Sequence, residues 1–198
     1  MKPNLAPMSR RSSNGKKQDW ANPALFGMHP SNTVPPAQLG VMLVRQLVEI
    51  YTDGACSRNP GPGGWAAILI YNDRFRQHVK EYSGHAEHTT NQRMELTAAI
   101  EGLKRLKTSC RVKLYSDSAY LVNAFARDWF AGWKRRDWKN ARNQPVSNQD
   151  LWEQLLELAK KHDIEWIKVE GHADNDWNNR CDQLAREAIK QGSAGKKP

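Results

Sequence analysis

Three strand-like segments follow one another between residues 47 and 82, with short connections between them. They are LVEIYTD (47–53), WAAILIY (65–71) and FRQHVKEY (75–82). The first connection is rich in glycine and proline, and the second is the turn NDR. Short connections join antiparallel neighbours, because parallel strands need a long crossover. We therefore expect an antiparallel meander at the start of the folded domain.

Beyond the meander, helical and strand patterns alternate. The helix over 89–107 has apolar residues on one face and begins with the capping pattern Thr89-x-x-Gln92, and a later helix begins with Ser147-x-x-Asp150. Further helices are expected over 119–130 and 178–191, and strands over 111–117 and 164–170. This order predicts an α/β fold, in which helices flank a mixed sheet.

The size and charge of the chain limit its function. With 198 residues, 39% of them hydrophobic, the chain can form one compact domain with an appendage. The net charge of +9 favours an anionic partner such as nucleic acid, although a basic protein can also be merely soluble. The three cysteines show no C-x-x-C spacing, so we expect neither a zinc site nor a disulfide framework.

The first 45 residues differ from the rest in composition. They contain six prolines, the basic run SRRSSNGKK and a single acid, Asp19. We expect a disordered tail over 1–45, a folded domain over 46–191 and a second disordered tail over 192–198. With no signal-peptide core and no membrane span in the sequence, we expect a cytoplasmic protein; a basic arm or an organelle transit peptide is the alternative for the tail.

Four acidic residues occupy positions where strands end or helices begin. They are Asp53, Glu95, Asp117 and Asp182. Each has an ordinary structural explanation, as a turn residue, a helix cap or a partner of the helix dipole. Strand ends and helix starts can nevertheless converge at one edge of a sheet. Clustered carboxylates would repel one another unless a cation relieved them, and hard oxygen ligands suit Mg²⁺ or Mn²⁺.

Five motifs together resemble a known family. They are IYTDGACSRNPGPGGWAAIL, TTNQRMELTAAI, LYSDSAYLV, WFAGWKRRDWK through NQDLW, and VEGHADNDWNNRCDQLA. In this order the chain resembles a bacterial type 1 ribonuclease H over residues 47 to 190. The resemblance implies a five-stranded mixed sheet whose first three strands are antiparallel. It also implies an endonuclease that cuts the RNA strand of an RNA–DNA hybrid and leaves 5′-phosphate ends. Two Mg²⁺ ions, for which Mn²⁺ can substitute, would be held by Asp53, Glu95, Asp117 and Asp182.

The same resemblance implies further site residues. His172 matches a histidine that assists proton transfer or product release. Four polar residues match positions that contact the minor groove of the hybrid: Cys56, Asn59, Asn91 and Gln92. Thr90 and Asn148 match a pocket for a phosphate of the DNA strand. A basic protrusion, residues 127–142, would bind the DNA backbone through Trp133, Lys134, Arg135, Arg136, Trp138 and Lys139.

The sequence departs from the family at His88, Ala119 and Asn179, where relatives can have arginine, a polar residue and an acid. These changes concern the phosphate pocket, one contact to RNA and the local charge.

We expect a monomer. Two alternatives are an integrase or transposase core, which would lack the protrusion, and a catalytically silent hybrid-binding module, which would not need the four acids.

Overall fold

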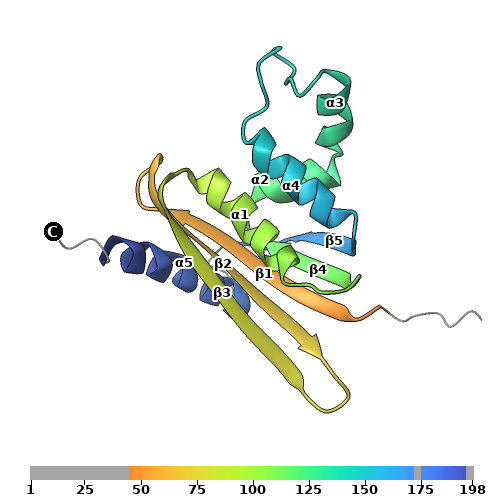
Figure 1. Cartoon of the computed structure of the whole chain (residues 1–198), viewed down its shortest axis with the longest axis vertical. Coiled ribbons are helices and arrows are strands. Elements are labelled where there is room, and N and C mark those ends of the chain that lie inside the picture. Colours follow the sequence, from red (N-terminus) through yellow and green to blue (C-terminus); the bar gives the residue numbers. More distant parts are fainter. Residues whose placement is uncertain (1–44, 172–174, 195–198) are drawn as a thin grey trace, which may run out of the picture. The chain divides into compact units, whose positions relative to one another are not determined.

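The computed structural model describes residues 45–171 and 175–194. The strands are β1 (Leu47–Cys56), β2 (Gly61–Asn72), β3 (Gln77–Thr89), β4 (Arg111–Ser116) and β5 (Asp163–Lys168). The helices are α1 (Asn91–Lys104), α2 (Ala119–Ala126), α3 (Trp129–Arg135), α4 (Gln149–Ala159) and α5 (Asp176–Ala194). Figure 1 shows these elements in sequence colours. None of the helices described is both long and apolar enough to span a bilayer.

The strands form one sheet of five in the order β3-β2-β1-β4-β5. β1 pairs with β2 and β2 with β3 in antiparallel fashion, whereas β4 is parallel to both β1 and β5. The predicted α/β fold, with its antiparallel meander and mixed sheet, is therefore confirmed. The parallel pairs arise because the chain crosses the sheet through α1 between β3 and β4, which returns β4 to the side of β1, and through α2 to α4 between β4 and β5.

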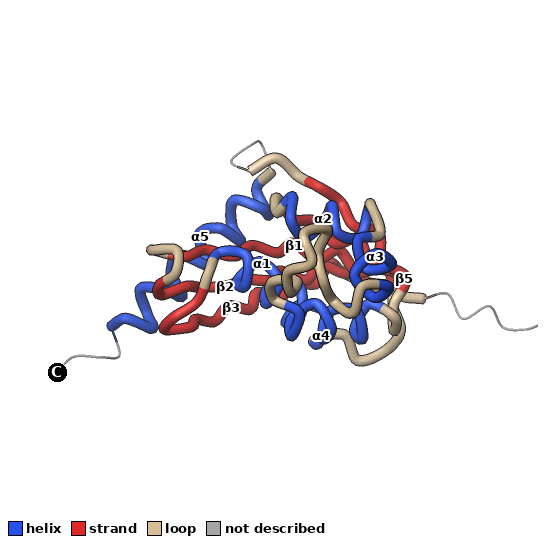
Figure 2. Tube along the Cα trace, turned by 90° about the horizontal axis from the view of Figure 1, so that it is seen from above, coloured by secondary structure: helices blue, strands red, loops and turns tan. Residues whose placement is uncertain are grey.

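Alternating residues of the strands feed two separate cores, one on each face of the sheet. In β2, Ala67 and Leu69 join the core that contains α1 and α4, whereas Ala66, Ile68 and Ile70 join the core under α5. Figure 2, viewed from above, shows α5 running along one side of the strands, with α1 and α4 on the other side. The larger core includes the fully buried Trp152 of α4.

Several element boundaries differ from the expected ones. α1 is capped by Thr90, whose Oγ1 accepts from the Arg93 amide at 3.3 Å, and not by Thr89. α4 has Asn148 rather than Ser147 at its cap position, in a left-handed conformation with φ 61° and no capping hydrogen bond from its side chain. The helix expected over 119–130 is broken, because Asp128 adopts φ 45° between α2 and α3. α5 continues to Ala194, beyond the expected end of the domain at residue 191.

Candidate active site

Asp53 and Glu95 are brought together by the close approach of α1 to β1. Strand alternation places Asp53 on the α5 side, with Tyr51, and Gly54 on the α1 side. A Cβ atom on Gly54 would lie 2.2 Å from the backbone nitrogen of Glu95. Only glycine permits this contact, so the start of α1 sits directly against the strand that carries Asp53. The Gly54 amide also donates to Asp53 Oδ1 at 2.7 Å.

Asp117 immediately follows β4, the parallel neighbour of β1. Its position beside the end of β1 follows from the register, which pairs Thr52 with Ser116. The next residue, Ser118, caps α2 and donates a hydrogen bond to Glu95 Oε2. Gly171 covers the other side, where an added Cβ would lie 2.9 Å from Asp117 Oδ2.

Asp182 enters from the opposite face of the sheet, on α5. Asn178, Asp182 and Arg186 are four residues apart, so they share one side of the helix. Arg186 Nε donates to Asp182 Oδ1 at 2.7 Å. Asn175 caps the start of α5: its side-chain oxygen Oδ1 accepts a hydrogen bond from the backbone N–H of Asn178 at 3.1 Å.

These elements enclose a cavity of about 520 Å³, which we call the carboxylate pocket. All four predicted acids line it: Asp53, Glu95, Asp117 and Asp182. Residues far apart in the sequence, from β1, α1, the end of β4 and α5, thus meet at one place. The prediction that these carboxylates converge agrees with this arrangement.

Without a bound cation, the carboxylate pocket disfavours the ionised form of its acids. Asp53 is only 7% exposed, and burial, together with the nearby Asp117, raises its pKa to about 8. Burial also raises the pKa of Glu95, although hydrogen bonds from Ser118 and Asn91 oppose that rise. A cation in the pocket would stabilise the ionised form of both side chains and so oppose both rises in pKa.

The donor chemistry fits a hard divalent cation, since every acid in the pocket offers carboxylate oxygens. In residues 45–171 and 175–194, no three acidic, histidine or cysteine side chains are arranged so that they could hold a metal as they stand. Glu95 accepts hydrogen bonds from Asn91 and Ser118, and Asp182 accepts one from Arg186, so a cation that used these oxygens would have to replace protein hydrogen bonds.

A second cavity, of about 640 Å³, adjoins the carboxylate pocket and shares Asn91, Glu95 and Asp117 with it. It contains most of the polar residues that the sequence had suggested for substrate: Asn59, Thr90, Asn91, Gln92 and Asn148. Cys56 lines the carboxylate pocket instead. His172 lies outside the described residues, so its role stays a prediction.

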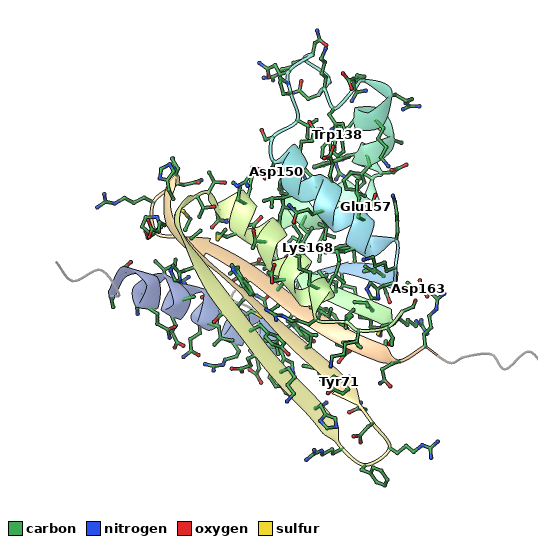
Figure 3. The ribbon with its side chains drawn as sticks, in the orientation of Figure 1. Tyr71, Trp138, Asp150, Glu157, Asp163 and Lys168 are labelled. Atoms are coloured by element: carbon green, nitrogen blue, oxygen red, sulfur yellow. The ribbon has the colours of Figure 1, made fainter. Side chains whose placement is uncertain are left out.

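Within the second cavity, Asn59 Oδ1 accepts from the Asn91 amide at 3.3 Å, which ties the loop after β1 to the start of α1. Arg93 forms a two-pronged ion pair with Asp150 and also donates to Asn148 Oδ1 at 3.4 Å. Figure 3 shows Asp150 at the start of α4. These contacts hold Thr90 and Asn148 on the two walls of one cavity.

The basic protrusion contains α3 and the loop that precedes α4. Trp133 packs on Trp138 and Trp152, with ring centroids 5.9 and 5.7 Å away, so the two predicted tryptophans are partly buried against the core. Lys134, Arg135 and Arg136 are exposed. Lys139 is half-buried, and its carbonyl accepts from Arg136 Nε at 3.1 Å.

The sequence did not single out Ser118, Asn178 or Arg186 as site residues. Ser118 was visible only as part of a helix-capping pattern, and its bond to Glu95 depends on how α1 packs. The spacing of Asn178 and Arg186 around Asp182 was a usable signal, because residues four apart share a helix face.

Comparisons with known proteins show which family the chain is similar to. The ribonuclease H family model matches residues 45–190. Ribonuclease H of Symbiobacterium thermophilum is 62% identical over 152 residues, which cover 77% of this chain and 100% of that protein. The Moorella thermoacetica ribonuclease H is 63% identical over 142 residues, covering 72% and 91%.

Solved structures give the same result for the fold. LC9-RNase H1, a type 1 RNase H with the type 2 active-site motif, superposes with a TM-score of 0.67 at 29% identity, over 74% of each chain. LC11-RNase H1, solved in complex with an RNA/DNA hybrid, has a TM-score of 0.56 at 20% identity, over 73% of this chain and 98% of that one. The match over most of the chain and the high identity to curated relatives show that this chain belongs to the ribonuclease H family.

Proposed function

We propose that this protein is an endonuclease that hydrolyses the RNA strand of RNA–DNA hybrids, with two Mg²⁺ ions, and leaves 5′-phosphate ends. The observation that carries the proposal is the convergence of the four acids on one pocket, where Asp53 is buried beside other carboxylates and has a raised pKa. Such a site is stable in its ionised form only with cations, which suits chemistry on a phosphate chain.

Each acid has a distinct part in the proposal. Asp53, the most buried, would hold the ions together with Glu95 and Asp117, which line both the carboxylate pocket and the second cavity. Asp182 would complete the set from α5 once it separates from Arg186. When bound, the ions supply an activated water and stabilise the leaving oxygen.

The second cavity supports a hybrid as the substrate. Its walls carry short amide and hydroxyl side chains, which are suited to 2′-hydroxyl and phosphate oxygens. Because it shares Glu95 and Asp117 with the carboxylate pocket, a strand bound there would run directly to the acids. One structural neighbour, LC11-RNase H1, was solved with an RNA/DNA hybrid.

The exposed cations of the basic protrusion, Lys134, Arg135 and Arg136, would bind the DNA strand. Contacts of this kind go to phosphates, so they increase affinity without sequence preference. His172 would assist proton transfer or product release, because histidine can change its charge near neutral pH.

A cleavage assay tests the proposal. The full chain and its Asp53→Asn variant are incubated with labelled RNA–DNA hybrid, duplex RNA and duplex DNA, with Mg²⁺ or with EDTA. We expect only the hybrid to be cut, only in its RNA strand, and only by the wild type with Mg²⁺. Cleavage in EDTA, or cleavage by Asp53→Asn at the wild-type rate, would contradict the proposal. Hybrid binding without cleavage in Mg²⁺ would point to the silent binding module.

A further inference from the structure

Asn178 is a buried polar residue whose position is not explained by packing. Its side chain is 2% exposed, and it lines the carboxylate pocket together with Asp53, Asp117 and Asp182. Its side-chain oxygen, Oδ1, has no hydrogen-bond partner within the described part of the chain. A buried acceptor without a partner destabilises the fold, so this atom calls for a ligand.

The surroundings of this oxygen restrict what that ligand can be. Asn178 lies one helical turn before Asp182, on the same side of α5. The Asn178 backbone is already fixed by the cap from Asn175. The carboxylate pocket that it lines holds four acids, which cannot donate a hydrogen bond once they are ionised, and the cations Arg186 and Lys190. Neither cation bonds to Asn178 Oδ1, which has no partner among the described residues. From outside the chain, a donor that suits this oxygen carries a positive charge or a polarised O–H group.

A hydrated divalent cation meets both requirements. Carbonyl oxygens are suitable ligands for hard cations, and Mg²⁺ keeps several of its waters when it binds to proteins. A water on such a cation is a strong donor, and partners that hold metal-bound groups contribute to affinity even when they do not touch the metal.

We propose that Asn178 Oδ1 is a fifth oxygen of the carboxylate pocket, and that it accepts a hydrogen bond from the hydration shell of the bound cation. This inference rests on the proposed function, since it assumes that the acids hold a divalent cation. It makes Asn178 a positioning residue: it orients a water of the cation on the side of the pocket formed by α5. It also accounts for a polar side chain in a place where an apolar one would otherwise pack as well.

Mg²⁺ binding to the full chain without substrate is the direct test, measured by titration calorimetry together with thermal unfolding in EDTA and in Mg²⁺. Asn178→Ala should weaken Mg²⁺ binding about tenfold, in the range found for residues that support metal ligands indirectly. Asn178→Asp retains an acceptor oxygen at the same place, so it should bind Mg²⁺ at least as tightly as the wild type. Asn123→Ala in α2 is the matched control, since Asn123 does not line the pocket.

A purely structural role for Asn178 predicts a different result. In that case Asn178→Ala would lower the unfolding temperature in EDTA but leave Mg²⁺ affinity within twofold of the wild type, and the proposal would be overturned. Asn178→Leu fills the same volume, so it provides the measurement if Asn178→Ala does not fold; it should also lose affinity. Absence of Mg²⁺ binding and of cleavage in the wild type would overturn the proposed function itself, whereas unchanged binding in Asn178→Ala and Asn178→Leu would overturn only this role.

Discussion

Arg186 Nε lies 2.7 Å from Asp182 Oδ1, one turn further along α5. The arginine side chain is 58% exposed and the aspartate 24%, so the ion pair lies at the mouth of the carboxylate pocket. The Arg186 guanidinium is thus hydrogen-bonded to an oxygen of Asp182 that the proposed function assigns to a metal ion. Arg186 is the counter-ion of Asp182 in this structure, and it would compete with the proposed cation.

Removing this competitor should strengthen metal binding. We expect Arg186→Met to bind Mg²⁺ about 2- to 5-fold more tightly than the wild type, the gain expected from releasing a partly exposed ion pair. Lys190→Met is the control, because it removes the same charge from the lining of the pocket and leaves the Asp182–Arg186 pair intact. Equal Mg²⁺ affinities in Arg186→Met and Lys190→Met would show that only the net charge of the pocket matters.

The metal-free protein should lose stability as the pH rises from about 4 to 8. The pKa of Asp53 is 3.8 unfolded and about 8 folded, so the folded state binds more protons in this range and each rise in pH favours unfolding. Acids with a lowered pKa, such as Asp150, act below this range. Denaturant unfolding in EDTA at a series of pH values measures the slope. Mg²⁺ should flatten it, because the cation stabilises the ionised acids.

Asp53→Asn should be more stable than the wild type without metal. The amide removes the buried charge and keeps an oxygen for the Gly54 amide, so the unfolding free energy at pH 8 should rise by on the order of 2 kcal/mol. The same variant should lose cleavage and most of the stabilisation by Mg²⁺. Asp163→Asn, an exposed change at the start of β5, should alter neither property. If Asp53→Asn were less stable than the wild type, the hypothesis that the buried charge of Asp53 destabilises the metal-free fold would be wrong.

Gly54→Ala should separate β1 from α1. The new Cβ would lie 2.2 Å from Glu95 N and 2.4 Å from the carbonyl carbon of Met94, and both are backbone atoms that cannot move aside alone. We expect a loss of about 3 kcal/mol or more in unfolding free energy, at the upper end for overpacking. Gly132→Ala in α3 meets only the flexible end of Arg136 at 3.2 Å, so it should be neutral or slightly stabilising. Thermal unfolding distinguishes the two.

Neutralising Lys134, Arg135 and Arg136 together should weaken hybrid binding, with the largest effect at low salt. Fewer phosphate contacts make the dependence of log K on log salt shallower, by about 0.7–0.9 for each contact removed. Binding measured between 50 and 200 mM salt gives the slope. Neutralising Arg74, Arg76 and Lys80, which are exposed around the β2–β3 turn, removes the same charge elsewhere and should leave the slope nearly unchanged. Identical slopes for the two triple variants would exclude a specific role for the protrusion.

The sequence predicted the sheet well because its pattern is local. Alternation within β1 and β2 and the short connections between them were enough to indicate the meander. The helix break at Asp128 was missed, because a single left-handed residue leaves the apolar pattern on either side intact. The caps were each displaced by one residue, since Thr89 and Thr90, like Ser147 and Asn148, are neighbouring residues with similar capping ability.

The site was predictable only in part. Periodicity could not bring Asp53, Glu95 and Asp182 together, and the resemblance supplied that grouping. The partners of these acids depend on packing: Ser118 reaches Glu95 because α2 begins beside α1, and Arg186 reaches Asp182 through helix geometry. The spacing of Asn178 from Asp182 can be read in the sequence, but only the structure shows that its oxygen has no partner among the described residues.

The two cores on opposite faces of the sheet have a consequence for cooperativity. β2 supplies Ala67 and Leu69 to one core and Ala66, Ile68 and Ile70 to the other, so a change in the position of β2 affects the packing of both. The acids come from both faces, with Glu95 on α1 and Asp182 on α5. A cation bound between them would link α1 to α5 across the edge of the sheet. Its release would make the structure less rigid on both faces at once.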